Sequence, residues 1–366
     1  MNIPMVDLVE QYKTIKKEID QEINKVLQTG RFIMGPNVEA FNKEMADYTE
    51  TKYGIGCASG TDALQLCLMA IDIKPGDEVI TTPFTFVATA EVIALLGAKP
   101  VYVDIEEDSY LIDVDKIENA ITDKTRAIIP VHLFGQAADM DHINKIAKKH
   151  NFYVIEDACQ AVGAKYKSKS VCSLGDLGCL SYFPAKNLGA FGDGGHVLTS
   201  NKKLADKVRT LMDHGSDKRY HHSRLGINSR LDALQAAILR VKLKYIDQWN
   251  EARKDRAALY TELLKDAKVQ TPVIKEYNDH VFHQYSIQVE DRDGLQEHLK
   301  KAGIASAIHY PIPLHLQPAY KKFSDGEGSF PISEKTAKHI ISLPMYPELG
   351  EKEIQFIART ITEYTG

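Results

Sequence analysis

The chain has 366 residues, of which 44% are hydrophobic, so it can bury a sizeable core, and its length favours two or three domains over one. Basic and acidic side chains nearly balance at a formal net charge of -5, which gives no electrostatic footprint for nucleic-acid binding. The N-terminus has no basic segment followed by an apolar core, and no apolar run is long enough to span a bilayer. These features predict a cytoplasmic enzyme for small molecules, with no nucleic-acid or membrane partner.

The cysteines and histidines give no pattern of a disulfide framework or a metal site. The five cysteines are Cys57, Cys67, Cys159, Cys172 and Cys179. They include no Cys-x-x-Cys pair, and an odd number in a long chain favours reduced thiols in core positions. The adjacent pair His221-His222 offers metal-binding side chains, but neighbours on an extended segment point to opposite sides, and no carboxylate cluster accompanies them. We therefore expect no metal.

The first fifty residues are predicted to be helical. An amphipathic run follows Val6-Asp7-Leu8 and ends at Gly30, and a second run covers residues 38–48. From Tyr53 onward, β-rich and helical runs alternate. The predicted strands are 53–58, 78–82, 99–104, 126–131 and 152–156, and the predicted helices between them are 63–71, 87–96 and 139–150. This βαβ rhythm predicts an α/β domain with a mostly parallel sheet covered on both faces.

A further strand is predicted at residues 194–199, followed by helices at 202–212 and 230–264, the second being the longest that the sequence offers. The pattern then changes. The remaining predicted elements are strands at 284–289 and 305–310 and helices at 294–302 and 351–362. We therefore expect a large α/β domain with an N-terminal helical flank over residues 1–247 and a smaller C-terminal α+β domain over residues 248–366.

A candidate anion site follows the first predicted strand, in Ser59-Gly60-Thr61-Asp62. Gly60 permits close approach of a ligand, while the Thr61 hydroxyl and the free amides at the start of the next helix face one point. The helix dipole adds to the attraction for a phosphate. An ordinary helix N-cap explains the same four residues, so the motif by itself leaves both interpretations open.

Lys186 and Asp157 are the candidate catalytic pair. Lys186 lies in an apolar-flanked turn between segments expected to be ordered, and burial there would lower its pKa and supply the neutral amine that Schiff-base formation needs. Asp157 ends a predicted buried strand, where a carboxylate can keep a pyridine nitrogen protonated. A solvent-exposed lysine and a satisfied strand-end carboxylate are the alternatives for each residue taken alone.

The combination of these motifs in this order carries a resemblance. A glycine-threonine loop, the aromatic segment 83–86, a strand ending in Asp157 and then Ser181 and Lys186 closely resemble the sugar aminotransferases of the DegT/DnrJ/EryC1/StrS family. The resemblance extends nearly from end to end of the chain. Pro4–Leu8, Gly30–Pro36 and Ile341–Met345 also belong to it. The family belongs to the fold type I pyridoxal phosphate enzymes, and the resemblance implies that fold and that cofactor.

Transferred to this sequence, the family pattern implies a role for each cofactor-binding residue. Lys186 would be the Schiff-base lysine and Asp157 the partner of the pyridine nitrogen, with Gln160 near the ring hydroxyl. The remaining implied contacts are Gly60, Thr61 and Ser181 at the phosphate, Phe86 on one face of the ring and Cys159 on the other. Asn228 corresponds to the residue that reaches the phosphate from the neighbouring subunit, which implies a homodimer with two shared active sites.

The resemblance implies a transamination in two halves. L-glutamate displaces Lys186 from the cofactor aldehyde, and Lys186 then moves a proton from the amino acid to the cofactor before 2-oxoglutarate leaves. A nucleotide-linked keto sugar reverses these steps and departs as an amino sugar, which predicts ping-pong kinetics. Relatives that dehydrate sugars carry histidine in place of the lysine, so Lys186 favours transamination. His196 stands where relatives often have a small residue, and we assign it to structural packing.

The segments 214–226 and 307–313 resemble enzymes that aminate C3 of UDP-2-acetamido-2-deoxy-3-oxo-D-glucuronate, for surface polysaccharide or lipopolysaccharide synthesis. A uronic acid carries a carboxylate, which an arginine fork with nearby histidine and tyrosine donors can bind. Arg230, His309 and Tyr310 are the candidate substrate-binding residues, although Arg230 serves a structural ion pair with equal plausibility.

Two alternatives remain open at the level of the sequence. Within the enzyme interpretation, the chain would aminate C3 of a dTDP-linked 3-keto-6-deoxyhexose, a neutral sugar for which no cation is needed. In a different class, it would be a catalytically silent pyridoxal phosphate-binding sensor or scaffold. The intact Lys186 and Asp157 count against the silent protein.

Overall fold

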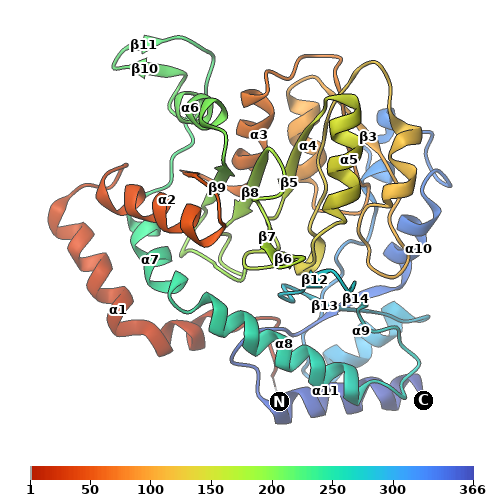
Figure 1. Cartoon of the computed structure of the whole chain (residues 1–366). Coiled ribbons are helices and arrows are strands. Elements are labelled where there is room, and N and C mark those ends of the chain that lie inside the picture. The colour runs from red at the N-terminus through yellow and green to blue at the C-terminus, as the bar shows by residue number, and fades with distance from the viewer. Residues whose placement is uncertain (1) are drawn as a thin grey trace.

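The computed structural model describes residues 2–366 and has a seven-stranded mixed sheet at its centre (Figure 1). In spatial order its strands are β1 (Tyr53–Cys57), β9 (Gly195–Thr199), β8 (Leu177–Ser181), β5 (Tyr153–Asp157), β4 (Thr125–Ile128), β2 (Glu78–Thr81) and β3 (Lys99–Tyr102). Only β9 runs antiparallel to both of its neighbours, β1 and β8. The predicted α/β domain with a mostly parallel sheet is therefore confirmed, and so are its five predicted strands.

Helices cover both faces of this sheet, as the alternation of side chains along the strands requires. The helices of this part are α1 (Leu8–Thr29), α2 (Pro36–Tyr48), α3 (Gly60–Ala70), α4 (Ala88–Leu95), α5 (Met140–His150), α6 (Lys202–Leu211) and α7 (Ala233–Leu243). One core cluster joins α1, α2, α5 and α7 to one face, and a second joins α3, α4 and α6 to the other. In β5, for example, Val154 belongs to the first cluster and Ile155 to the second.

Local sequence explains where the principal helices begin and end. The side chain of Asp7 accepts a hydrogen bond from the amide of Glu10 (2.9 Å) and so caps α1, which stops at Gly30 in the left-handed conformation (φ 64°). Asp139 caps α5 in the same way, and Asn151 ends that helix in the left-handed conformation. The two predicted N-terminal helical runs are thus confirmed as α1 and α2.

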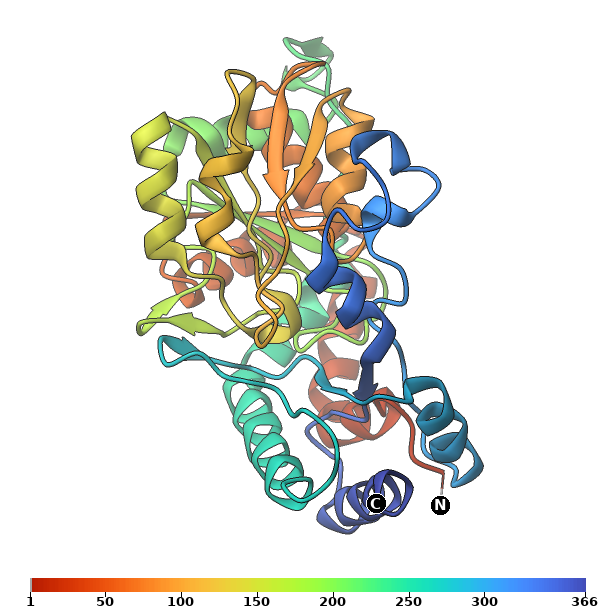
Figure 2. The same ribbon diagram turned by 90° about the vertical axis from the view of Figure 1, so that its right-hand side faces the viewer.

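The C-terminal part has a separate core below the sheet (Figure 2). Its elements are α8 (Ile246–Leu263), β13 (Tyr285–Gln288), α9 (Arg292–Lys301), α10 (Pro331–His339), β14 (Ile340–Leu343) and α11 (Glu351–Thr365). Short strands lie outside the central sheet and the β13–β14 pair: β6 (Lys165–Tyr166), β7 (Lys169–Ser170), β10 (Ser216–Lys218), β11 (His221–His222) and β12 (Asn278–Asp279). The expected boundary at residues 247 and 248 falls inside α8, and the two-domain division stays a prediction.

Two element predictions were wrong. The expected single helix over residues 230–264 is divided at Lys244 and Tyr245, because α7 packs on α1 and α2 while α8 continues into the C-terminal core. The longest helix is instead α1, with 22 residues. The expected strand at 305–310 forms only an isolated bridge between Ala307 and Ser342, on the edge of β14 that does not pair with β13.

The five cysteines are free thiols, and all but Cys159 are buried. None of the helices in residues 2–366 combines the length and apolarity that crossing a bilayer requires. Over the same residues, no group of three or more His, Cys, Asp or Glu side chains is placed to hold a metal ion.

His196 lies in β9 and is fully buried. Its ring meets the edge of Phe41 at 5.5 Å and that of Tyr182 at 6.0 Å between ring centroids. Within residues 2–366 neither of its ring nitrogens has a hydrogen-bond partner, and burial lowers its pKa to about 3. The residue therefore packs in the core between β9 and α2.

We predict that His196→Leu makes the protein less sensitive to acid. The folded state keeps His196 neutral far below its ordinary pKa of 6.5, whereas the unfolded state binds a proton there. Its contribution to stability is therefore complete above pH 6.5 and is lost as the pH falls toward 3, by about 1.4 kcal/mol for each pH unit. Urea unfolding at pH 7 and pH 5 should show a smaller difference in unfolding free energy for the variant. Equal differences in the two proteins would contradict this.

Candidate active site

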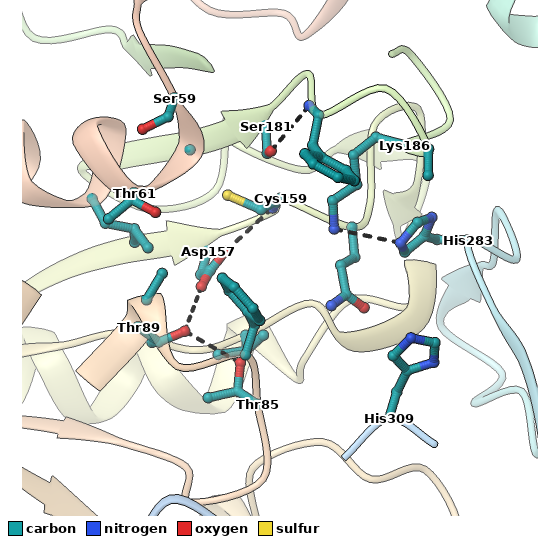
Figure 3. Close-up of a pocket in the computed structure, with 18 of the residues that line it drawn as sticks. Ser59, Thr61, Thr85, Thr89, Asp157, Cys159, Ser181, Lys186, His283 and His309 are labelled. Atoms are coloured by element: carbon teal, nitrogen blue, oxygen red, sulfur yellow. Dashed lines mark hydrogen bonds between the residues drawn. The ribbon is translucent and has the colours of Figure 1, made fainter. Parts of the chain in front are cut away.

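A cavity of about 460 Å³ opens where β5 and β8 end and α3 begins. Ligands of open α/β sheets bind at the carboxyl ends of the strands. Ten of the predicted site residues line this cavity: Gly60, Thr61, Phe86, Asp157, Cys159, Gln160, Ser181, Lys186, His309 and Tyr310. Figure 3 shows side chains from these separate elements pointing toward a common space.

The N-terminus of α3 forms one end of the cavity. The Ser59 side chain caps the helix by accepting a hydrogen bond from the amide of Asp62 (3.1 Å), while Gly60 and Thr61 face the cavity. A Cβ atom at Gly60 would lie 2.7 Å from Cβ of Ser181 and 2.9 Å from Sγ of Cys159, so only glycine fits there. The ordinary cap is therefore present in this turn, and the free amides beside it are able to attract an anion.

The Asp157 carboxylate is held in one orientation near the centre of the cavity. Its Oδ2 accepts a hydrogen bond from the hydroxyl of Thr89 (2.8 Å), and its Oδ1 accepts one from the amide of Cys159 (3.2 Å) (Figure 3). The hydroxyls of Thr85 and Thr89 lie 3.2 Å apart. Asp157 is only 6% exposed, and these donors satisfy its buried oxygens. It can therefore hold a protonated ring nitrogen.

Lys186 reaches the cavity from the turn that follows β8, which is closed by the hydrogen bond from its amide to the Phe183 carbonyl (2.8 Å). Burial lowers the pKa of its amine, and the electrostatic influence of Cys159 and Asp157 opposes that shift. This lowering of the Lys186 pKa agrees with the expectation from the sequence. Its Nζ lies 3.4 Å from Nε2 of His283, a buried residue that lines the same cavity.

Gln160 links the cavity wall to the segment that follows α9. Its Oε1 accepts a hydrogen bond from the amide of Phe134 (2.8 Å), and its Nε2 donates to the hydroxyl of Tyr310 (2.9 Å). Because this hydroxyl accepts from Gln160, its own proton remains available to a ligand. Nδ1 of His309 lies 2.9 Å from the hydroxyl of Ser342. Phe86 is 54% exposed and packs at 6.3 Å from the Tyr310 ring.

Asn228 and Arg230 do not line the cavity of their own chain. Arg230 donates to Asp213 (3.0 Å), which is the ion pair that the sequence left open as its alternative role. Asn228 is exposed and forms a backbone bridge to Asp213. The structure thus brings together all predicted site residues except these two.

Sequence reasoning missed Thr85, Thr89 and His283. Thr85 stands within the aromatic segment 83–86 and Thr89 four residues later, in the first turn of α4. That spacing was a usable signal. No local pattern marks His283, which approaches Lys186 through contact between distant segments.

The donor set of the cavity fits pyridoxal phosphate. Free helix amides beside Gly60 match a phosphate, the Asp157 carboxylate matches a pyridinium nitrogen, and the Lys186 amine matches an aldehyde. The tight space at Gly60 also supports the match, since a side chain there would close the approach to the helix amides.

The fold and cavity define the class of fold type I aminotransferases. The family model for the DegT/DnrJ/EryC1/StrS aminotransferases matches residues 13–362, and the chain belongs to this family. It is therefore an enzyme, which sets aside the silent sensor or scaffold.

The chain is 50% identical to a "Pleiotropic regulatory protein" of Geobacillus stearothermophilus over all of this chain and 99% of that protein. It is 48% identical to a "UDP-2-acetamido-2-deoxy-3-oxo-D-glucuronate aminotransferase" of Pseudomonas aeruginosa, over 98% of this chain and 99% of that protein. Among solved structures, DesV of S. venezuelae in complex with a ketimine intermediate matches with a TM-score of 0.97 at 40% identity, over 100% and 98% of the two chains.

We predict that Thr89→Val weakens cofactor binding about tenfold or more. Valine preserves the shape of the side chain but leaves Oδ2 of Asp157 without its donor, and a hydrogen bond to a charged group contributes about 1.5 to 3 kcal/mol. Absorbance titration of the cofactor-free protein with pyridoxal phosphate measures the dissociation constant. Thr85→Val is the matched control, because Thr85 contacts Thr89 but donates nothing to Asp157. Equal affinities for the Thr89 variant and the wild type would contradict the proposed anchoring.

Proposed function

We propose that this sugar aminotransferase transfers the amino group of L-glutamate to C3 of UDP-2-acetamido-2-deoxy-3-oxo-D-glucuronate, in the cytoplasm, for surface polysaccharide synthesis. Its cofactor is pyridoxal phosphate. The observation that carries the proposal is the meeting of Lys186, Asp157 and the amides of α3 in one cavity. These are the three groups that this chemistry needs, supplied by elements far apart in the sequence.

Separate residues of the cavity would bind the cofactor and move the proton. Gly60, Thr61 and Ser181 bind the phosphate, and Asp157 holds the ring nitrogen with its positive charge. When bound, pyridoxal phosphate supplies a ring that accepts the electron pair left on carbon after a proton is removed. Lys186, whose pKa burial lowers, takes that proton from the amino acid and returns it at the neighbouring carbon.

The second half of the reaction uses the same residues in reverse. The keto sugar receives the amino group, Lys186 moves the proton back, and the amino sugar leaves before the next L-glutamate enters. Cys159 and Phe86 would enclose the two faces of the ring, and Gln160 would lie near its hydroxyl. Because both substrates use one site in turn, ping-pong kinetics follow.

We infer a homodimer with shared active sites. The β10–β11 hairpin stands away from the body of the subunit in Figure 1, and the aromatic ring of Tyr220 at its tip is 81% exposed. The neighbouring Leu225 is 93% exposed, and Asn228 follows on the same segment. Exposed apolar side chains on a projecting arm are suited to a second copy of the chain. In that arrangement Asn228 would reach the phosphate in the partner's cavity.

His309 and Tyr310 would recognise the sugar. Burial, with Lys186 nearby, lowers the pKa of His309 to about 4, so this ring is neutral at physiological pH. It can donate a hydrogen bond but supplies no positive charge for a uronate. Arg230 lies two residues beyond Asn228, and we propose that it enters the partner's cavity with Asn228 and provides that charge.

A second candidate substrate is a dTDP-linked 3-keto-6-deoxyhexose, aminated at C3. The observation in its favour is the ion pair between Arg230 and Asp213. Within the subunit, this ion pair engages the arginine that is proposed to bind the carboxylate of the uronate. A neutral sugar needs no such ligand, so His309 and Tyr310 would be enough to orient it.

We predict that borohydride reduction of the loaded enzyme fixes the cofactor on Lys186. Peptide mapping by mass spectrometry locates the modified residue, and L-glutamate alone should convert the cofactor to its amine form and prevent the fixation. Lys242 is the internal control, because its amine is also buried but donates to the Gly189 carbonyl rather than lining the cavity. Modification at another residue, or none, would overturn the proposed reaction.

We predict that Arg230→Ala lowers kcat/KM for the uronate about 30-fold or more and leaves a 6-deoxy keto sugar nearly unaffected. Removing one partner of a buried charge pair costs 2 kcal/mol or more, on the order of a 30-fold change. The two sugars are offered to the amine form of the enzyme, and NMR of the product assigns the amine position. Asp213→Asn is the matched control, since it breaks the ion pair and keeps the guanidinium. Equal losses on both sugars in both variants would assign Arg230 a structural role.

A further inference from the structure

His283 lies between β12 and β13, and its side chain lies beside that of the catalytic lysine in the cavity (Figure 3). Its side chain is buried, with 7% exposure, and its Nε2 atom lies 3.4 Å from Nζ of Lys186. None of the roles in the proposed reaction uses this ring. A buried polar ring in contact with the catalytic amine calls for an account of what it does there.

A chain of hydrogen bonds fixes the tautomer of this ring. The Val162 carbonyl can only accept, so it takes a hydrogen bond from Nδ2 of Asn250 (3.0 Å) and leaves Oδ1 of Asn250 as an acceptor. Nδ2 of Asn187 donates to that oxygen (2.8 Å) and to the Val281 carbonyl (3.0 Å). Oδ1 of Asn187 therefore faces Nδ1 of His283, at 3.3 Å.

It follows that Nδ1 of His283 carries the proton and donates it to Asn187. The Nε2 atom then has a free lone pair, which points to the amine of Lys186. Two backbone carbonyls that cannot change their role thus determine, through two amide side chains, that the lysine faces an acceptor rather than a donor.

The charges around the pair keep the ring neutral. The other ionisable groups that influence Lys186 and His283 are Asp157, Cys159, His309 and Arg253. Burial, with further contributions from the cations Lys186 and Arg253, lowers the pKa of His283 well below its ordinary value. The lysine amine keeps its proton in preference to this imidazole, so His283 receives a hydrogen bond without taking the proton.

We propose that His283 is a positioning residue of the transamination: its Nε2 accepts a hydrogen bond from the ammonium form of Lys186 whenever that lysine carries the migrating proton. The inference rests on the proposed function. The proton leaves the carbon of the substrate, resides on Nζ of Lys186, and returns to carbon, so His283 gains and loses none. An acceptor at this position stabilises the ammonium form and directs its remaining protons toward the cavity.

The first test measures the lysine without any catalytic turnover. In the cofactor-free protein, the pH dependence of Lys186 labelling by fluorodinitrobenzene, located by peptide mapping, gives its pKa. His283→Phe keeps the ring shape and removes the acceptor, so the pKa of Lys186 should fall by about one unit. His283→Gln places an amide oxygen within similar reach and should keep the pKa of Lys186 close to its wild-type value. His280→Phe, a buried histidine of the same segment that contacts Phe282 rather than Lys186, should leave the pKa unchanged.

The second test separates positioning from binding. In His283→Phe, kcat should fall by at least tenfold while KM for L-glutamate stays within about twofold of the wild-type value. The limb of the pH–activity profile that Lys186 controls should move to lower pH. Asn187→Leu leaves the imidazole in place but frees its tautomer, and should shift the same limb in the same direction. An unchanged labelling curve in both His283→Phe and Asn187→Leu would overturn the proposal. Because labelling needs no sugar or amino acid, a failure of the proposed transamination would show separately in the turnover assay.

Discussion

The structure depends on one buried carboxylate, that of Glu156, which is fully inaccessible to solvent. Its four donors are Nε2 of His132 (3.0 Å) and the amides of Cys172 (2.8 Å), Leu174 (2.8 Å) and Gly175 (2.7 Å). A buried charge is tolerated only when its oxygens are satisfied in this way. Through Glu156, the end of β5 is tied to the loop before β8 and to the segment after β4. The strand that carries Asp157 is thereby immobilised at the point where the cavity begins.

Alternation along β5 separates the two acidic residues into two tasks. Successive side chains of a strand point to opposite faces of the sheet. Glu156 therefore points to the face where it accepts hydrogen bonds from the loop before β8, while Asp157 points to the other face, toward the cavity and Thr89. The rigid strand end then holds the carboxylate that we propose binds the cofactor ring, and the burial that secures it also withdraws water from Lys186. Desolvation lowers the pKa of that amine, so the packing that stabilises the fold also prepares the nucleophile.

Much of the architecture could be predicted because its signals are local. β-rich runs between helical ones gave the five strands from β1 to β5, and caps such as Asp7 and Gly30 gave the ends of α1. The failures arose where distant contacts decide. Helical periodicity continues through Lys244 and Tyr245, yet packing against two different cores divides α7 from α8. β8 was not anticipated, since its sequence of glycine, cysteine and leucine lacks the β-branched residues that mark a strand.

The sequence by itself determined the α/β class and the family resemblance, and it singled out Lys186 and Asp157 as the candidate catalytic pair, because motif order and local periodicity are properties of the linear chain. Only the tertiary structure decided that Thr89 holds Asp157, that His283 faces Lys186 and that Arg230 pairs with Asp213 within the subunit. These are contacts between elements far apart in the chain. Their geometry is set by the packing of helices and strands around shared cores, for which no local pattern of residues encodes the partner.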